Sequence, residues 1–381
     1  MALTPSEARL VADALHLVRN SEVLNPELSE RRRSYNYDAL KAAGRLGILG
    51  VRVPADQGGR GHSFEGYAAI TEALARVDFG YSLAAANTAN IAALLSTEAN
   101  SDVAQAFLPE LLSGETIGCI GITEPEAGSD LTSLKTIARK DGNGWLISGR
   151  KAWITNAEAA GVIVVYAQTE AGRGASGIAS FIVDAEREGF FRDPPFNLSG
   201  PSTAGIGGFR LENYRVNEAD LIHPPGVGFK SVMVLINIAR TYVAAMCCGM
   251  VAEALDLAVE YGNRRQTFGK LLIQHQGWRW PIAEAMTELS AARGLVQTAC
   301  ERIDAGEDVQ FEAAQAKLFA TRMAERHLPR LAHALGAEAL KEKYPLVRHQ
   351  IAARAASLVD GSTEMLLERI FAGVQSGSNI K

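Results

Sequence analysis

Apolar residues recur with helical spacing at both ends of the chain. Within residues 5–113 the segments "TPSEARLVADALHLV" and "FEGYAAITEALARV" carry this spacing, and the first begins with Thr and Pro, which favour the first turn of a helix. After Gly228 the same spacing returns in four long segments, at about 230–263, 271–305, 310–335 and 344–370. Four long helices with short connections favour an antiparallel bundle.

The middle of the chain has a different pattern. Short β-branched or alternating runs lie between Gly, Asn and Asp turns: "ETIGCIGIT", "GWLISGRKAWI", "GVIVVYAQT", "IASFIVD" and "GGFRLENYRV". Such runs predict an antiparallel sheet or barrel. We therefore expect an α+β protein, and a doubly wound fold is disfavoured because strands and helices do not alternate. Its predicted parts are an N-terminal helical domain (1–115), a central antiparallel β-domain (116–226) and a C-terminal four-helix bundle (227–381).

Composition excludes several classes of protein. The chain has 381 residues and is 47% hydrophobic, so it buries a sizeable core and is not disordered. A net charge of -5 without a basic block argues against nucleic acid as a partner. The N-terminus lacks an apolar signal-peptide region, and no uncharged apolar stretch of about 18 residues occurs, which predicts a cytoplasmic protein with no membrane partner. The four cysteines have no CxxC spacing and are interpreted as reduced core residues.

Common nucleotide-binding and nucleophile motifs are missing from the sequence. The "GIGG" at residues 205–208 leads into a strand-like run instead of a helix, and neither a P-loop nor a GxSxG elbow occurs. His327 and His333 are six residues apart on a predicted helix, so they point to opposed faces. The remaining histidines are scattered, and we expect no metal site.

Three motifs suit a planar heteroaromatic ring and a pyrophosphate. "GITEPEAGSD", over residues 121–130, ends the first strand with hydroxyls, free backbone N–H groups and a glycine for close approach. "GRKAWITNA", over residues 149–157, adds an aromatic face and a hydroxyl at a strand end. "RRQTFGKLLIQHQ", over residues 264–276, opens a helix with cations and an aromatic ring.

With these motifs in this order, essentially the whole chain resembles the acyl-CoA dehydrogenase family of flavoproteins. "GITEPEAGSD" fits the family signature at its diagnostic positions, and "KAWITNA", "RQTFGKLLIQHQ" and Tyr344-Pro345 follow in the expected order. The resemblance implies the three-part fold predicted above, FAD as cofactor and a homotetramer. It also implies removal of an α-proton from an acyl thioester by a carboxylate, while the β-hydrogen leaves as hydride to the flavin.

The resemblance also assigns roles to individual residues. Thr123 and Ser129 would contact the flavin or the thioester, and Trp153 and Thr155 would cover the flavin ring. FAD of a neighbouring subunit would meet a second set of residues: Arg265, Thr267, Phe268, Gln276, His333 and Gly336. The adenylate side of the cofactor would be held by Ser362, Thr363 and Glu364. Arg240, in "INIART", would lie near the mouth of the thioester channel, with Asn237 close to the substrate carrier.

Asp360, in "SLVDGSTEMLLERI", is the candidate catalytic base. It occupies the position at which the family places a glutamate, and its side chain is shorter by about 1.5 Å. Ala239 stands at the alternative base position of some relatives, so that second base is missing. Three interpretations stay open for Asp360: an active base, a redirected flavin chemistry, or a helix stop in a protein with altered or lost chemistry.

Other departures from the family pattern lie around the substrate and the cofactor diphosphate. The segment "GAEA" replaces GGxG at residues 336–339, "GPSTAGI" lacks an arginine, and Ile351-Ala352 replaces an Arg-Asp pair. The expected substrate is therefore an acyl thioester, on CoA or on a carrier protein, other than an ordinary straight-chain fatty acyl-CoA. The electron acceptor would be a flavoprotein or oxygen, and the alternative is a flavoprotein oxidase of the nitroalkane or aminoacyl type.

Overall fold

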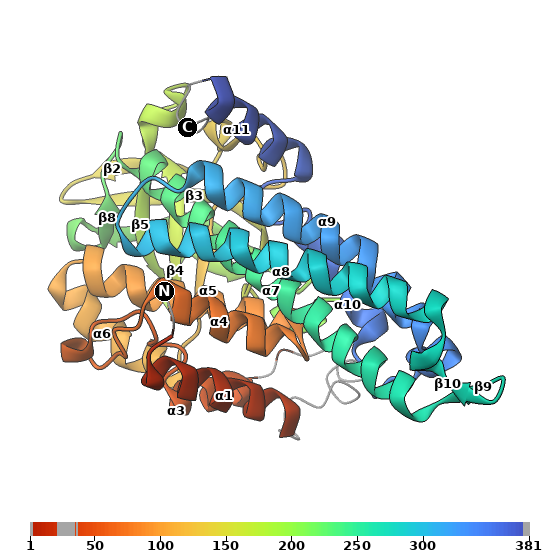
Figure 1. The fold of residues 1–381 in the computed structure, drawn as a ribbon. Helices are drawn as coiled ribbons and strands as arrows, with labels where there is room; N and C mark the ends of the chain where they lie inside the picture. The colour runs from red at the N-terminus through yellow and green to blue at the C-terminus, as the bar shows by residue number, and fades with distance from the viewer. Residues whose placement is uncertain (1–2, 21–34, 36, 376–381) are drawn as a thin grey trace.

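A computed structural model describes residues 3–20, 35 and 37–375, and Figure 1 shows its helical and sheet regions. Two polar side chains fix where N-terminal helices begin. Ser63 accepts a hydrogen bond from the Gly66 N–H, and Asp78 accepts one from the Tyr81 N–H, so both act as N-caps. The helices of this region are α1 (Pro5–Asn20), α3 (Tyr37–Leu46), α4 (Phe64–Ala75), α5 (Phe79–Glu98) and α6 (Ser101–Ser113).

The central region is one eight-stranded sheet with the order β6-β7-β3-β2-β4-β5-β8, in which β1 also pairs with β4. Most neighbours are antiparallel, as predicted, but β4 pairs in parallel with β1 and with β2. The strands are β1 (Gly118–Gly121), β2 (Ile137–Asp141), β3 (Gly144–Ile154), β4 (Val162–Gln168), β5 (Ile178–Asp184), β6 (Phe190–Arg192), β7 (Gly207–Asn217) and β8 (Leu221–His223).

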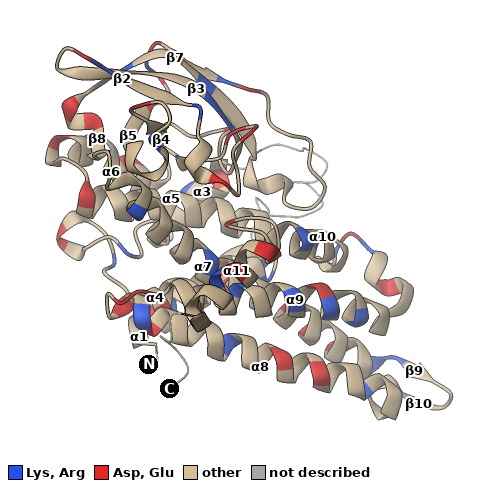
Figure 2. Ribbon diagram, turned by 90° about the horizontal axis from the view of Figure 1, so that it is seen from above, with Lys and Arg blue, Asp and Glu red and all other residues tan. Residues whose placement is uncertain are grey.

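The C-terminal region is built on three long helices that lie side by side in Figures 1 and 2. They are α7 (Gly228–Arg264), α8 (Gln276–Asp304) and α9 (Gln310–Ala334), and two shorter helices follow, α10 (Leu346–Ala356) and α11 (Thr363–Gln375). Figure 2 shows the sheet on one side of the molecule and this bundle on the other. Acidic and basic residues are interspersed along α8 and α9, and some pair between the two helices, as Arg326 does with Glu288 at 2.7 Å.

Two of the predicted helical segments differ from the structure. Residues 266–271 form a small hairpin of β9 (Gln266–Thr267) and β10 (Lys270–Leu271), so α8 begins later than expected. The predicted helix 344–370 is two helices, α10 and α11, separated by a turn. Asp360 and Gly361 adopt positive φ angles of 51° and 100°, so the turn after α10 cannot continue as a right-handed helix into α11.

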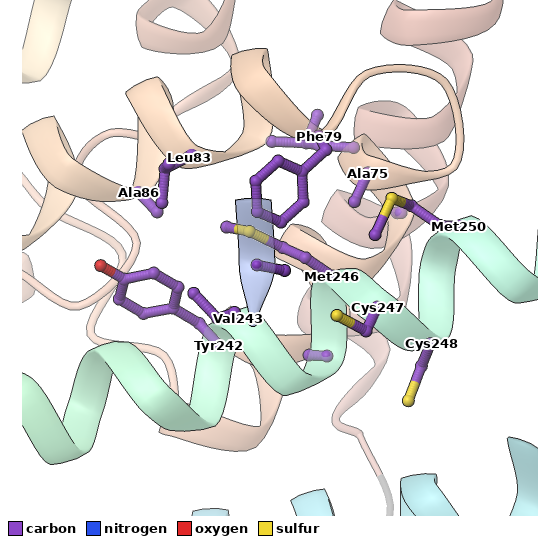
Figure 3. Packing of buried hydrophobic residues seen from close by; sticks show 14 of the residues in the cluster. Ala75, Phe79, Leu83, Ala86, Tyr242, Val243, Met246, Cys247, Cys248 and Met250 are labelled. Carbon is purple, nitrogen blue, oxygen red and sulfur yellow. The ribbon is translucent and has the colours of Figure 1, made fainter. Parts of the chain in front are cut away.

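Helix α7 is the central helix of the fold. It is long and apolar enough to cross a membrane by length and composition, but 83% of its most apolar stretch is buried inside the protein. In Figure 3 Tyr242 and Met246 of α7 lie toward α5, with its Phe79, and Met250 lies beside Ala75 of α4. We attribute the apolar character of α7 to this packing, since a helix surrounded by other elements has few polar faces.

Candidate active site

A cavity of about 490 Å³ lies where α5, the end of β1, the end of β3, α7 and the turn before α11 meet. Its volume is in the usual range for small-molecule sites. Seven of the residues predicted from the sequence line this cavity, although they come from distant parts of the chain: Thr123, Ser129, Trp153, Thr155, Arg240, Asp360 and Ser362.

The end of β3 presents an aromatic face to the cavity. The register between β3 and β7 shifts between Ala152 and Ile154, which turns Trp153 out of the sheet. Trp153 has a φ of 61° and is 59% exposed, and its ring lies 4.7 Å from that of Phe196. A bulky residue held in the left-handed region, with its ring in the open, is a costly arrangement that marks a functional position.

Hydroxyl groups surround this aromatic face. The side chains of Thr123, Ser129 and Thr155 line the cavity and make no hydrogen bond to any residue that the structure describes. An exposed indole can stack on a planar heteroaromatic ring, and free hydroxyl groups beside it can form hydrogen bonds with the polar edge of that ring. The residues present therefore fit the isoalloxazine ring of FAD.

The signature loop is anchored by a buried ion pair that the sequence analysis did not anticipate. The Lys151 ammonium lies 2.8 Å from a Glu124 carboxylate oxygen, and it also donates to the Ile122 carbonyl at 2.9 Å. Glu124 in turn accepts hydrogen bonds from the N–H groups of Lys135 (2.6 Å) and Thr136 (2.9 Å). Burial raises the pKa of the Glu124 carboxyl, but Lys151 and these hydrogen bonds outweigh it and lower the pKa below its usual range. Glu124 therefore shapes the loop that carries Thr123.

Buried cations hold the turn that carries Asp360. Arg240 Nε donates to the Asp360 carbonyl at 3.0 Å. Lys317 Nζ, which comes from α9 and is fully buried, donates to the Gly361 carbonyl at 2.6 Å and also to the Val359 carbonyl. Three successive carbonyls of the turn are thus fixed, while the Asp360 carboxylate accepts no hydrogen bond from the described residues. The carboxylate is left available to the cavity.

The electrostatics of this turn favour a basic carboxylate. Burial raises the pKa of Asp360 above the ordinary 3.8, and the charges of Lys317 and Arg240 offset part of the rise. Burial likewise lowers the pKa of Lys317 to about 8 and that of Arg240 to about 10, although the Asp360 charge opposes both shifts. The turn thus places the Asp360 carboxyl group between two basic side chains, Lys317 and Arg240.

Asn237 lies behind Arg240 and does not line the cavity. Its side-chain oxygen accepts a hydrogen bond from Arg240 Nη1 at 2.9 Å, and the residue is 5% exposed. Gly361 lies close to the same guanidinium, because a Cβ atom there would be 3.0 Å from Arg240 Nη2. The hydrogen bond to Asn237 and the close approach of Gly361 thus fix the orientation of the Arg240 guanidinium beside Asp360. Thr363 and Glu364 follow in the first turn of α11, outside the cavity wall.

The remaining predicted cofactor residues lie at the other end of the bundle. The β9–β10 hairpin projects beyond the helices in Figures 1 and 2, far from the sheet. Phe268 sits at its tip, 98% exposed and with a φ of 50°. Arg265, Thr267 and Gln276 belong to the same region, and His333 and Gly336 lie where α9 ends. Within one chain these residues do not meet the cavity.

Two departures from the family pattern are neighbours in space. A Cβ atom on Gly200, in "GPSTAGI", would lie 2.7 Å from the side chain of Ile351. In the same loop Thr203 donates a hydrogen bond to the N-cap Asp78 of α5 at 2.7 Å. The loop that lacks the arginine therefore packs against Ile351, which belongs to the pair that replaces Arg-Asp. At the third departure, "GAEA", Gly336 has a φ of 60° and open space around it.

The sequence analysis missed Lys317 and Glu124, and it also missed Asn87 and Asn90, two amides of α5 that line the cavity. A signal existed for Lys317, because a lysine within the apolar run "AAQAKLFAT" is placed to be buried and to need a partner. The two asparagines offered a weaker signal, as polar residues in an otherwise small and apolar helix.

Comparisons with known proteins identify the family of the chain. Three acyl-CoA dehydrogenase domain models match successive parts of the chain: the N-terminal domain over residues 5–115, the middle domain over 119–214 and the C-terminal domain over 226–375. Human mitochondrial short-chain specific acyl-CoA dehydrogenase is 31% identical over 331 residues, covering 86% of this chain and 79% of the human protein.

Solved structures extend the likeness to the whole fold. Butyryl-CoA dehydrogenase from Megasphaera elsdenii is 28% identical, with a TM-score of 0.93, and the match covers 98% of this chain and 99% of that one. PigA with FAD and proline has the same fold, with a TM-score of 0.92 at 23% identity over 99% of both chains.

The fold and its relatives define a flavin-dependent oxidoreductase. The chain belongs to the acyl-CoA dehydrogenase family, and FAD is its cofactor.

Proposed function

We propose that the enzyme carries out FAD-dependent α,β-dehydrogenation of an acyl thioester, with Asp360 as the base that removes the α-proton. The supporting observation is the convergence of Asp360 with Trp153, Thr155 and Thr123 on one cavity. A carboxylate and a flavin-binding face across one cavity are the two groups that this reaction needs. CoA and a carrier-protein phosphopantetheine both remain candidates for the thioester handle.

Asp360 acts in its ionised form. Burial makes it a stronger base than an ordinary aspartate, so it takes up a weakly acidic proton more readily. The bonds from Arg240 and Lys317 to the turn hold its backbone while the proton moves. Bound FAD supplies the acceptor for the hydrogen that leaves the β-carbon.

The ring-binding groups are Trp153, Thr155, Thr123 and Ser129, and Ser362, Thr363 and Glu364 hold the adenylate side. We further propose that the hairpin carrying Arg265, Thr267 and Phe268, with Gln276, His333 and Gly336, completes the FAD site of a neighbouring subunit in a homotetramer. The exposure of Phe268 supports this role, because a large apolar side chain left in solvent within one chain is typical of a surface that a second chain covers.

A visible spectrum of the purified enzyme tests the proposal. Anaerobic addition of candidate acyl thioesters should bleach the flavin of the wild type, and Asp360→Ala should slow bleaching by about 10²- to 10⁴-fold. Equal reduction rates in the two proteins would show that another group is the base. Asp360→Glu is the companion variant: a slower reaction would show that the cavity is adapted to the shorter acid.

Turnover in air separates dehydrogenase from oxidase. Stoichiometric release of hydrogen peroxide would identify the oxidase alternative, of the nitroalkane or aminoacyl type. A requirement for an electron-transferring flavoprotein would support the dehydrogenase. A protein that does not retain FAD at all would contradict both.

A further inference from the structure

Helix α5 forms one wall of the cavity and presents both apolar and polar side chains to it. Leu83, Asn87 and Asn90 line the cavity from successive turns of this helix. Most other residues of α5 are small or aliphatic and buried, so two amides on the cavity side stand out. A buried amide is costly unless it is hydrogen-bonded, and the partners of these two therefore decide their role.

Asn90 is already engaged by the protein. Its side-chain oxygen accepts a hydrogen bond from the Tyr67 hydroxyl at 3.3 Å, and the Tyr242 hydroxyl lies nearby. All three residues are almost completely buried. The side-chain oxygen of Asn90 is therefore used to connect α4 with α5.

Asn87 differs from Asn90 in this respect. Its side chain borders the cavity, is partly exposed to it, and has no hydrogen-bond partner among the residues that the structure describes. Much of the remaining lining is apolar, as at Leu83, Ile120 and Ile236. An alkyl group packed against Asn87 would strip water from the amide and return no hydrogen bond.

The wall around Asn87 carries no charge. The cavity's charged residues, Arg240, Asp360 and Arg369, lie on α7, on the turn before α11 and on α11 itself, and none comes from α5. A carboxylate or an ammonium against α5 would therefore lose its hydration without a counter-charge, which is more costly than burying a neutral group.

We infer that the acyl group of the substrate carries a neutral hydrogen-bonding substituent, such as a hydroxyl or an amide, which pairs with the side chain of Asn87. This inference rests on the proposed function, because it names the class of acyl thioester that the same site accepts. Asn87 is thus a specificity-determining residue. A site built to hydrogen-bond a substrate group rejects the analogue that lacks it far more strongly than an apolar pocket rejects an extra methylene.

The test uses the FAD-bound enzyme and pairs of CoA thioesters that differ only in a hydroxyl or amide on the acyl chain. For the best pair, wild-type kcat/KM should favour the polar member by at least about tenfold, and Asn87→Leu should remove or reverse that preference. Dissociation constants of inert thioether analogues, measured by calorimetry, should shift in the same sense. Asn87→Ala serves as a second variant if the leucine protein does not fold.

Leu83→Ala is the matched control, because it enlarges the same wall without changing its polarity. It should alter both members of a pair equally. A wild-type enzyme that treats both members alike, with a ratio that Asn87→Leu leaves unchanged, would overturn the inference while the proposed function stands. If no thioester bleaches the flavin, the proposed function fails, and equal binding of the two thioethers then overturns the inference as well.

Discussion

Lys317 is the residue whose removal tests how the catalytic turn is held. It is fully buried, and its ammonium donates to the Gly361 carbonyl at 2.6 Å and to the Val359 carbonyl, on either side of Asp360. Lys317→Met keeps an unbranched side chain of similar length but removes both donors. We expect the substitution to damage catalysis much more than folding.

The expected size of the effect follows from opposing terms. Two buried carbonyls lose their partner, at about 1–3 kcal/mol each. Burial lowers the pKa of the Lys317 ammonium from 10.5 to about 8, so keeping it charged costs about 3 kcal/mol of folding free energy. The substitution removes that cost, which offsets part of the loss. The free energy of unfolding should therefore fall by no more than about 3 kcal/mol. A positioned base contributes about 10²- to 10⁴-fold to rate, so partial misplacement of Asp360 should lower kcat by about 10- to 10³-fold.

A stopped-flow instrument measures the change in reduction rate without the electron acceptor, in a single turnover followed by flavin absorbance at about 450 nm. We expect the limiting rate of flavin reduction to fall, with the apparent substrate Kd and the flavin spectrum unchanged. Lys230→Met, at an exposed lysine of α7, is the matched control and should behave as wild type. A reduction rate of Lys317→Met within about twofold of wild type, while Asp360→Ala is inactive, would refute this account of the turn.

Three further results are expected. The rate of flavin reduction should rise with pH through one ionisation above the ordinary aspartate value of 3.8, because the ionised form of Asp360 is the base and burial raises its pKa. A rate independent of pH would exclude Asp360 as the base. The contribution of this carboxyl group to the free energy of unfolding changes in the opposite direction, because stability gained at low pH is lost as pH rises through the raised pKa. Glu124→Gln should cost about 3–5 kcal/mol in denaturant unfolding because it strands a buried ammonium, whereas Glu126→Gln, at an exposed site of the same loop, should cost almost nothing. Trp153→Ala should weaken FAD binding by about tenfold or more in a fluorescence titration, and an equal loss from exposed Trp280→Ala would contradict a specific role for Trp153.

The local pattern predicted most of the fold. Helical and strand periods predicted the helix–sheet–helix order, and the structure confirms it. The prediction was wrong where a few residues override a long pattern. The apolar spacing of 344–370 continues across Asp360 and Gly361, so periodicity alone did not reveal the break, although a glycine after a polar residue is a turn signal. The parallel pairing of β1 with β4 was also not predictable, because strand direction depends on how the chain returns.

Candidate site residues were identified from motif order and family resemblance, and the structure brings seven of them to one cavity. Six other candidates do not line that cavity: Arg265, Thr267, Phe268, Gln276, His333 and Gly336. The role of each one stays a prediction until the variants above are measured.

The sequence by itself determined the secondary structure, the flavin motifs and the identity of the acid at the base position, because these depend on neighbours within a few residues. Only the tertiary structure decided the environment of that acid. Lys317 is 43 positions away from Asp360 and Arg240 is 120 positions away, yet both donate to its turn. The burial that raises the pKa of Asp360, the charges of Lys317 and Arg240 that offset part of that rise, and the cavity itself all depend on which helices pack together.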